Sequence, residues 1–235
     1  MEPGNERWVE IAIAHWERKA GPCLLLRSHH WGGETYCASP FHDGPTYLFK
    51  RYQLAGFRYL RFLHRCRRAK KVQRQHGQLA AAGFPVPKMV CLLEYKILGF
   101  TVGSLSVQEH VADSPNLLEM LRRTSSPSRR KELFHAIGQA VAQLHQCGFY
   151  HGELQPPNVL CRMDPLRFCW VDNDRGRQTR HLPHRLARDD LLQLSKWEGM
   201  ATCTDLRWAW HAYAVERQLG LRQRSRLLRS LLRNI

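Results

Sequence analysis

The chain has 235 residues, with 36 Lys or Arg against 20 Asp or Glu, so its formal net charge is +16. At 43% hydrophobic and 24% charged residues, the composition is that of a globular protein and excludes a disordered one. No run approaches the roughly 18 apolar residues of a spanning helix, and glutamates throughout the first twenty residues exclude a signal peptide. We therefore expect a cytoplasmic protein with a polyanionic partner: nucleic acid, an anionic membrane or a phosphorylated substrate.

The first half of the chain reads mainly as short strands. Compact apolar or alternating runs at 23–29, 34–40 and 47–52 are separated by glycine and proline turn signals, which predicts three strands. Residues 57–82 then follow a strongly basic helical pattern that a glycine and two prolines end. A second expected strand pair comprises residues 90–97 and 104–111.

The second half reads as helical. Apolar residues recur at three- and four-residue intervals from Leu133 to Leu144, which predicts a core-facing helix. Two short strand patterns at 159–161 and 167–172 predict a hairpin, and the chain is helical again from Pro183. We therefore expect an α+β, two-lobed fold with a small β-rich N-lobe, a helical C-lobe and a ligand site in the cleft. The expected lobes are residues 1–111 and 112–235.

The eight cysteines and thirteen histidines predict neither a disulfide framework nor a zinc site. No cysteine pair has CxxC spacing, and no histidines have HExxH or comparable spacing. We expect reduced and mostly buried thiols.

The positive charge is unevenly distributed. Residues 44–93 contain no acid, and none follows Glu216. Basic residues with interleaved aromatics, as in 57–74, suit an anionic membrane or a phosphosugar, although a solvated helix face has the same pattern. The basic C-terminal helix either packs on the core or inserts into a membrane.

A polar loop carries the residues most indicative of function. It contains Glu153 and Asn158, and Asp172 follows the predicted hairpin, while Lys50 lies far upstream in a predicted strand. Transfer of a phosphoryl group from ATP needs a cation on the phosphates, oxygen ligands for Mg²⁺ and a carboxylate that accepts the proton of the attacking hydroxyl. These residue types, in this order, are those of the protein-kinase layout.

Several segments resemble the lipopolysaccharide core kinases, the Kdo/heptose kinase family. HGELQPPNVLC and RFCWVDNDRGR are similar to its catalytic loop and its metal-binding segment. FKRYQLAGFRYLRF and LAAAGFPVPKMV resemble its lysine strand, basic stretch and proline turn, and HRLARDDLLQLSKW resembles its post-catalytic helix. The resemblance covers most of residues 45–200.

The resemblance implies a protein-kinase-like fold that uses ATP and Mg²⁺ to phosphorylate a sugar hydroxyl of the lipopolysaccharide core. The acceptor would be Kdo, heptose or another anionic glycolipid, at the cytoplasmic face of the membrane. Lys50 would bind the ATP phosphates, Glu153 would be the catalytic base, and Asn158 and Asp172 would hold Mg²⁺. The backbone of Glu109, His110 and Val111 would bind adenine.

Three departures from the kinase pattern leave an alternative open. The base position holds Glu153 in place of aspartate, and the predicted helix at 57–82 offers only Gln73, Gln75 or Gln78 as partners for Lys50. The only candidate for a glycine-rich phosphate loop is residues 32–33. The alternative is a pseudokinase of the same fold that acts as a binding or scaffold protein. A nucleic-acid-binding protein ranks last, because no recognised motif supports it.

Overall fold

The computed structural model describes residues 4–19, 21, 23–28, 33–41, 44–53, 68–111, 114–162, 165–197 and 199–232. The described chain forms two compact units, and each is described by itself. The first unit comprises residues 1–77 and 87–112, and the second comprises residues 78–86 and 113–235. Gly32 and residues 54–67, which hold much of the expected basic helix, lie outside the described residues.

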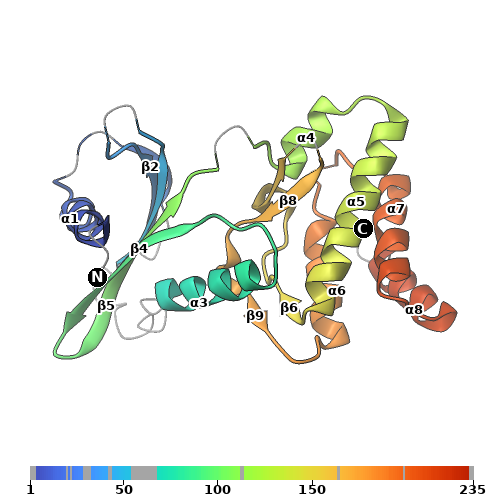
Figure 1. Cartoon of the computed structure of the whole chain (residues 1–235). Helices are drawn as coiled ribbons and strands as arrows, with labels where there is room; N and C mark the ends of the chain where they lie inside the picture. The colour runs from blue at the N-terminus through green and yellow to red at the C-terminus, as the bar shows by residue number, and fades with distance from the viewer. Residues whose placement is uncertain are drawn as a thin grey trace. The chain divides into compact units, whose positions relative to one another are not determined.

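An antiparallel five-stranded sheet forms the centre of the first unit, with strand order β1-β2-β3-β5-β4 (Figure 1). The strands are β1 Leu24–Ser28, β2 Glu34–Ala38, β3 Tyr47–Gln53, β4 Met89–Ile97 and β5 Phe100–Glu109. They agree closely with the five predicted strands. One face of the sheet packs into an apolar core, where Phe49, Leu105 and Val107 are completely buried.

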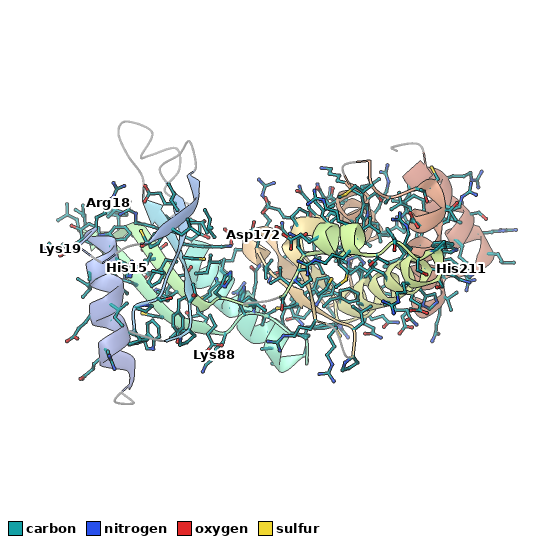
Figure 2. All side chains as sticks on the ribbon, turned by 90° about the horizontal axis from the view of Figure 1, so that it is seen from above. His15, Arg18, Lys19, Lys88, Asp172 and His211 are labelled. Atoms are coloured by element: carbon teal, nitrogen blue, oxygen red, sulfur yellow. The ribbon has the colours of Figure 1, made fainter. Side chains whose placement is uncertain are left out.

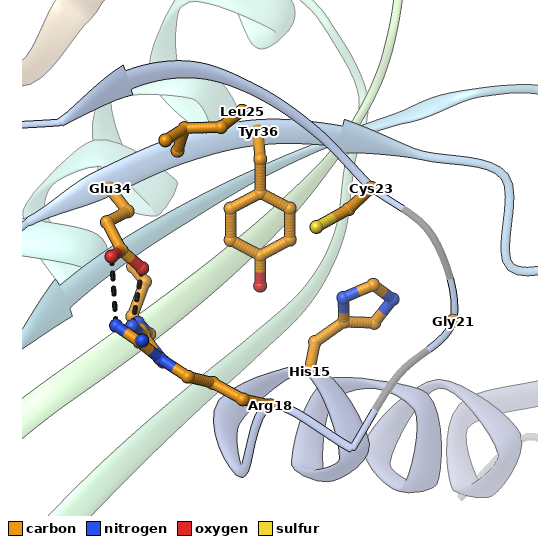
Figure 3. A pocket seen from close by; sticks show the side chains of 8 residues that line it. His15, Arg18, Gly21, Cys23, Leu25, Glu34 and Tyr36 are labelled. Carbon is orange, nitrogen blue, oxygen red and sulfur yellow. Dashed lines mark hydrogen bonds and ion pairs between the residues drawn. The ribbon is translucent and has the colours of Figure 1, made fainter.

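Helix α1 (Gly4–Trp16) covers this apolar face, and the sequence analysis did not predict it. Its residues Trp8, Ile11 and Ala12 pack into the core of the sheet. At its C-terminal end, Arg51 of β3 donates to the Trp16 carbonyl at 3.3 Å and pairs with Glu34. Arg18 pairs with the same carboxylate at 2.9 Å, beside a cavity of about 250 Å³ (Figure 3).

The position of Arg51 also shows on which face of the sheet the Lys50 side chain lies. Successive side chains of a strand point to opposite faces of the sheet. Because Arg51 is buried on the face that carries α1, Lys50 lies on the other face, half-buried, with Ser106 of β5 as its register partner.

Helix α3 (Arg68–Ala81) follows β3 and contains no acidic residue, as the sequence predicted. Of the three glutamines considered as partners for Lys50, Gln75 is buried, Gln78 is half-buried and Gln73 is exposed.

The second unit is mainly helical around one large core. Its helices are α4 Leu117–Arg123, α5 Pro127–Gln146, α6 His184–Leu194, α7 Cys203–Glu216 and α8 Leu221–Leu232. Its short elements are β6 Phe149–Tyr150, η2 Pro156–Asn158, β7 Val159–Arg162, β8 Arg167–Trp170, η3 Asn173–Arg175 and β9 Arg177–Gln178. The predicted helix and hairpin correspond to α5 and the β7–β8 pair.

The C-terminal helix packs on the protein core. Leu227 and Leu231 of α8 are 3% and 0% exposed and belong to the core of the second unit, while Arg222, Arg226 and Arg229 are exposed. The structure therefore favours core packing over insertion of α8 into a membrane. In the described part of the chain, no helix combines the length and the hydropathy needed to cross a bilayer.

Helices α5 and α7 approach each other closely at Gly138. A Cβ atom at Gly138 would lie 2.1 Å from the carbonyl oxygen of Ala209 in α7. We expect Gly138→Ala to lower the free energy of unfolding by about 3 kcal/mol, because the added methyl forces the helices apart. Thermal denaturation followed by circular dichroism measures this change.

A glycine in open space provides the control for this substitution. A Cβ atom at Gly77 of α3 meets no atom within 4 Å. Gly77→Ala is therefore expected to stabilise the protein by about 0.5–1 kcal/mol. Equal stability of the two variants would contradict the close helix approach.

Candidate active site

The β7–β8 hairpin brings two of the predicted site residues together. Val159 pairs with Trp170 in the ladder, and the Val171 amide donates to the Asn158 carbonyl at 3.1 Å. Asn158 and Asp172 therefore flank the same end of the hairpin. The Trp170 amide donates to the Pro85 carbonyl at 3.0 Å, so the proline turn after α3 supports the strand that leads to Asp172. Asp172 is labelled in Figure 2.

Asn158 is tied to the loop that carries Glu153. Its Nδ2 atom donates to the Glu153 carbonyl at 2.9 Å, which closes the five-residue step between them. The amide nitrogen of Asn158 is therefore used within the loop. Its Oδ1 atom is the group that can act as an oxygen ligand.

Asp172 adopts a backbone conformation that few side chains tolerate. Its φ and ψ are 58° and 43°, in the left-handed region, directly after the strand and before η3. Aspartate and asparagine adopt this region more readily than most residues with a side chain. The turn sets the direction of the Asp172 carboxylate at the end of the hairpin.

The Glu153 carboxylate forms an ion pair. Arg175 Nε lies 2.8 Å from Glu153 Oε1, and the Glu153 side chain is 26% exposed. Gly152 allows this approach: its φ is 81°, and a Cβ atom there would lie 2.8 Å from Arg175 Cβ. The segment after the hairpin thus supplies a carboxylate at Asp172 and, at Arg175, a cation for the loop carboxylate.

Asp190 of α6 holds the start of the same loop, and the sequence analysis did not identify it. This completely buried carboxylate accepts the His151 amide at 2.8 Å, the Gly152 amide at 2.9 Å and His145 Nε2 at 3.1 Å. The other ring nitrogen of His145, Nδ1, forms a hydrogen bond with the Tyr213 hydroxyl at 2.9 Å. Charge-assisted bonds of this kind fix the backbone that precedes Glu153.

His151 is a structural member of the loop. It is 3% exposed, and its Nδ1 accepts the Glu153 amide at 3.3 Å. Burial lowers the pKa of His151, against the opposing charges of Asp190 and Asp172 and a backbone hydrogen bond at Val171. The ring is therefore neutral at neutral pH and supports the loop without adding charge.

Two more predicted residues lie at the end of the first unit's sheet. Glu109 ends β5, where its amide donates to the Lys88 carbonyl at 3.0 Å, and the His110 amide donates to Thr46 at 3.1 Å. Among the described residues, the Val111 amide has no intramolecular acceptor.

The oxygen donors of the second unit fit a magnesium ion. The described residues contain no cluster of three or more His, Cys, Asp or Glu, so a ligand cage of the zinc type is not present there. Mg²⁺ is usually held by one or two protein oxygens together with substrate phosphates. The Asn158 amide oxygen and the Asp172 carboxylate are oxygens of the chemical type that Mg²⁺ accepts.

Comparisons with known proteins agree on the family and the fold. Residues 48–214 match the profile described as the lipopolysaccharide kinase (Kdo/WaaP) family. A solved structure of WaaP in complex with acyl carrier protein matches with a TM-score of 0.75 at 19% identity, over 99% of this chain and 95% of that one. A search of curated proteins gives no significant match. The structural match confirms the protein-kinase-like fold, and the family match spans well over half of the sequence. The chain therefore belongs to the lipopolysaccharide kinase (Kdo/WaaP) family.

Proposed function

We propose that this chain transfers the γ-phosphate of ATP to a sugar hydroxyl of the lipopolysaccharide core, on Kdo or on heptose. Family membership makes it a kinase of lipopolysaccharide by class. The observation that carries the finer proposal is the meeting of Glu153, Asn158 and Asp172 around one hairpin and its preceding loop. We take residues 1–111 and 112–235 as the N-lobe and C-lobe of this kinase.

Each residue of the second unit has a proposed role. Asn158 and Asp172 would hold Mg²⁺, which neutralises phosphate charge when it is bound. Glu153 orients the acceptor hydroxyl and accepts its proton, and the ion pair with Arg175 holds the carboxylate in place. Asp190 positions the loop through its two backbone contacts.

Two roles in the first unit are proposed from the family resemblance. Lys50 binds the ATP phosphates, and the Glu109–Val111 backbone binds adenine. Lys50 stands on the face of the sheet opposite α1, and the Val111 amide is available to an acceptor on the base. Both observations agree with these roles.

The proposed acceptor also defines the partners. Lipopolysaccharide core or another anionic glycolipid is the substrate, and an anionic membrane surface at the inner face of the cytoplasmic membrane carries it. The net charge of +16 supports both, and nucleic acid is not proposed as a partner. Because the solved WaaP structure is a complex with acyl carrier protein, we include acyl carrier protein as a further proposed partner of this chain.

A substitution that removes the charge of Glu153 tests its proposed role as the catalytic base. We expect Glu153→Gln to lower kcat by about 100-fold or more with little change in KM for ATP, because an amide does not accept the hydroxyl proton. Steady-state kinetics with lipopolysaccharide core acceptor measures both constants. Glu132→Gln, at an exposed glutamate of α5, is the control. A kcat close to that of the parent protein would remove Glu153 from the chemistry.

The alternative is a pseudokinase of the same fold that acts as a scaffold in envelope biogenesis. Two observations favour it: α3, the helix after the lysine strand, contains no acidic residue, and the Glu153 carboxylate forms an ion pair with Arg175. Stabilisation by MgATP in a thermal shift assay, without product on any core acceptor, would support the pseudokinase. Product formation that Asp172→Asn abolishes would support the kinase.

A further inference from the structure

The tip of the β4–β5 hairpin exposes an unusual set of apolar side chains. We call residues 95–100 the hairpin tip. Leu98 is 92% exposed, Phe100 is 65%, Ile97 is 51% and Tyr95 is 48%. Ile97 and Phe100 are register partners, so the two lie side by side on adjacent strands next to Leu98. Neighbouring exposed apolar residues of this kind mark an interaction surface.

The backbone of the turn is also unexpected for its sequence. Leu98 and Gly99 both have positive φ, at 49° and 80°. Two-residue hairpin turns of this kind favour Asn-Gly or Asp-Gly, because a branched apolar side chain is disfavoured in the left-handed region. A leucine here serves neither the turn nor the protein core. A residue that departs from the sequence preference of its local structure, without a gain in packing, often has a functional role.

The base of the hairpin is fixed, while the tip projects from it. Gly103 pairs with Tyr95, and a Cβ atom at Gly103 would lie 2.3 Å from the Trp16 ring. The Trp16 and Tyr95 rings lie 5.7 Å apart. The end of α1 therefore packs against the hairpin at this level, and exposure increases from Tyr95 to Leu98.

Two lysines lie at the base of the tip. Glu94 lies at the base of the tip, and its Oε2 atom is 2.6 Å from Lys70 Nζ of α3 and 3.9 Å from Lys96 Nζ. Lys71 and Arg74 are exposed on the same part of α3. Lys70 and Lys96 thus lie beside one carboxylate at the base of the apolar tip.

We propose that the hairpin tip inserts into an anionic bilayer and docks the protein on the membrane. Leu98, Ile97 and Phe100 would enter the interface, while Lys96 and Lys70 at the base of the tip contact lipid phosphates. The alternative, a protein partner, is less favoured because a stable protein interface buries roughly 1,000 Å² or more, which a six-residue convex tip does not supply. This inference rests on the proposed function, because a kinase whose acceptor is a membrane glycolipid has to reach the membrane surface.

The test is co-sedimentation of the full chain with sucrose-loaded vesicles in the absence of ATP. We expect binding to phosphatidylcholine vesicles that contain phosphatidylglycerol, and weaker binding at high salt. The double variant Leu98→Asn with Phe100→Thr is expected to lower the partition coefficient by roughly tenfold or more. Leu98→Asn suits the turn, so its thermal midpoint should equal or exceed that of the parent protein.

A matched control shows whether vesicle binding depends on the tip or on any exposed leucine. Leu221→Asn changes a leucine of the second unit that is 83% exposed and should leave vesicle binding unchanged. Equal binding by the double variant and the parent protein would overturn the proposal, as would no binding by the parent protein. A dimer in solution that Leu98→Asn dissociates would assign the tip to a second copy and also overturn it.

A water-soluble core oligosaccharide separates failure of this proposal from failure of the proposed function. Because that acceptor needs no membrane, Leu98→Asn should phosphorylate it at the rate of the parent protein. Loss of vesicle binding with unchanged phosphorylation is the result that supports membrane docking.

Discussion

Asp172→Asn is expected to lower kcat for phosphate transfer by on the order of 1,000-fold or more, because it removes the charged oxygen ligand proposed for Mg²⁺. The fold should not change, since asparagine also adopts the left-handed conformation that Asp172 has. The variant should lose the thermal stabilisation that MgATP gives to the parent protein. Thermal shift and single-turnover kinetics measure the two effects separately.

The exposed variant Glu132→Gln serves as the control for Asp172→Asn, because it removes one negative charge from α5 of the same unit. It should keep both the thermal shift and the rate. Full phosphate transfer by folded Asp172→Asn would show that the carboxylate at the hairpin end has no part in the reaction.

Asp190→Ala is expected to lower the free energy of unfolding by about 3–5 kcal/mol. The substitution leaves the amides of His151 and Gly152 and the Nε2 proton of His145 without their shared buried acceptor. The conservative variant Asp190→Asn keeps one acceptor oxygen and should lose less stability. Chemical denaturation followed by tryptophan fluorescence gives the free energies.

A kinetic readout distinguishes positioning by Asp190 from simple stabilisation. In folded Asp190→Asn, kcat should fall while KM for ATP stays near the parent value, because the loop that carries Glu153 loses its fixed backbone. Arg185→Ala, at an exposed position of the same helix, is the control. A free energy of unfolding for Asp190→Ala within about 0.5 kcal/mol of the parent would contradict the buried network.

The hairpin and its flanking residues were predictable from sequence. Val159–Arg162 and Arg167–Trp170 are short apolar strands around a turn, and their pairing fixes Asn158 and Asp172 at one end. Asn158 and Asp172 lie next to these strands in the sequence, so predicting the hairpin is enough to predict that the two residues lie close together. The family resemblance added the expected chemistry of those positions.

The contacts of Asp190 and the helix α1 were not predictable in the same way. Asp190 meets His151 and Gly152 across 38 or 39 residues of sequence, so no local spacing indicates the contact. Helix α1 has an apolar stripe at Trp8, Ile11 and Ala12, in a stretch for which the sequence analysis predicted no element. Its packing on the sheet is a tertiary effect that outweighs a modest local pattern.

The most direct test of the account is mass spectrometry of lipopolysaccharide core acceptors after incubation with the purified chain and MgATP. The account predicts one added phosphate on a Kdo or heptose hydroxyl with the parent protein, and none with Asp172→Asn. An unmodified acceptor with the parent protein, under conditions where MgATP stabilises it, would contradict the proposed kinase activity.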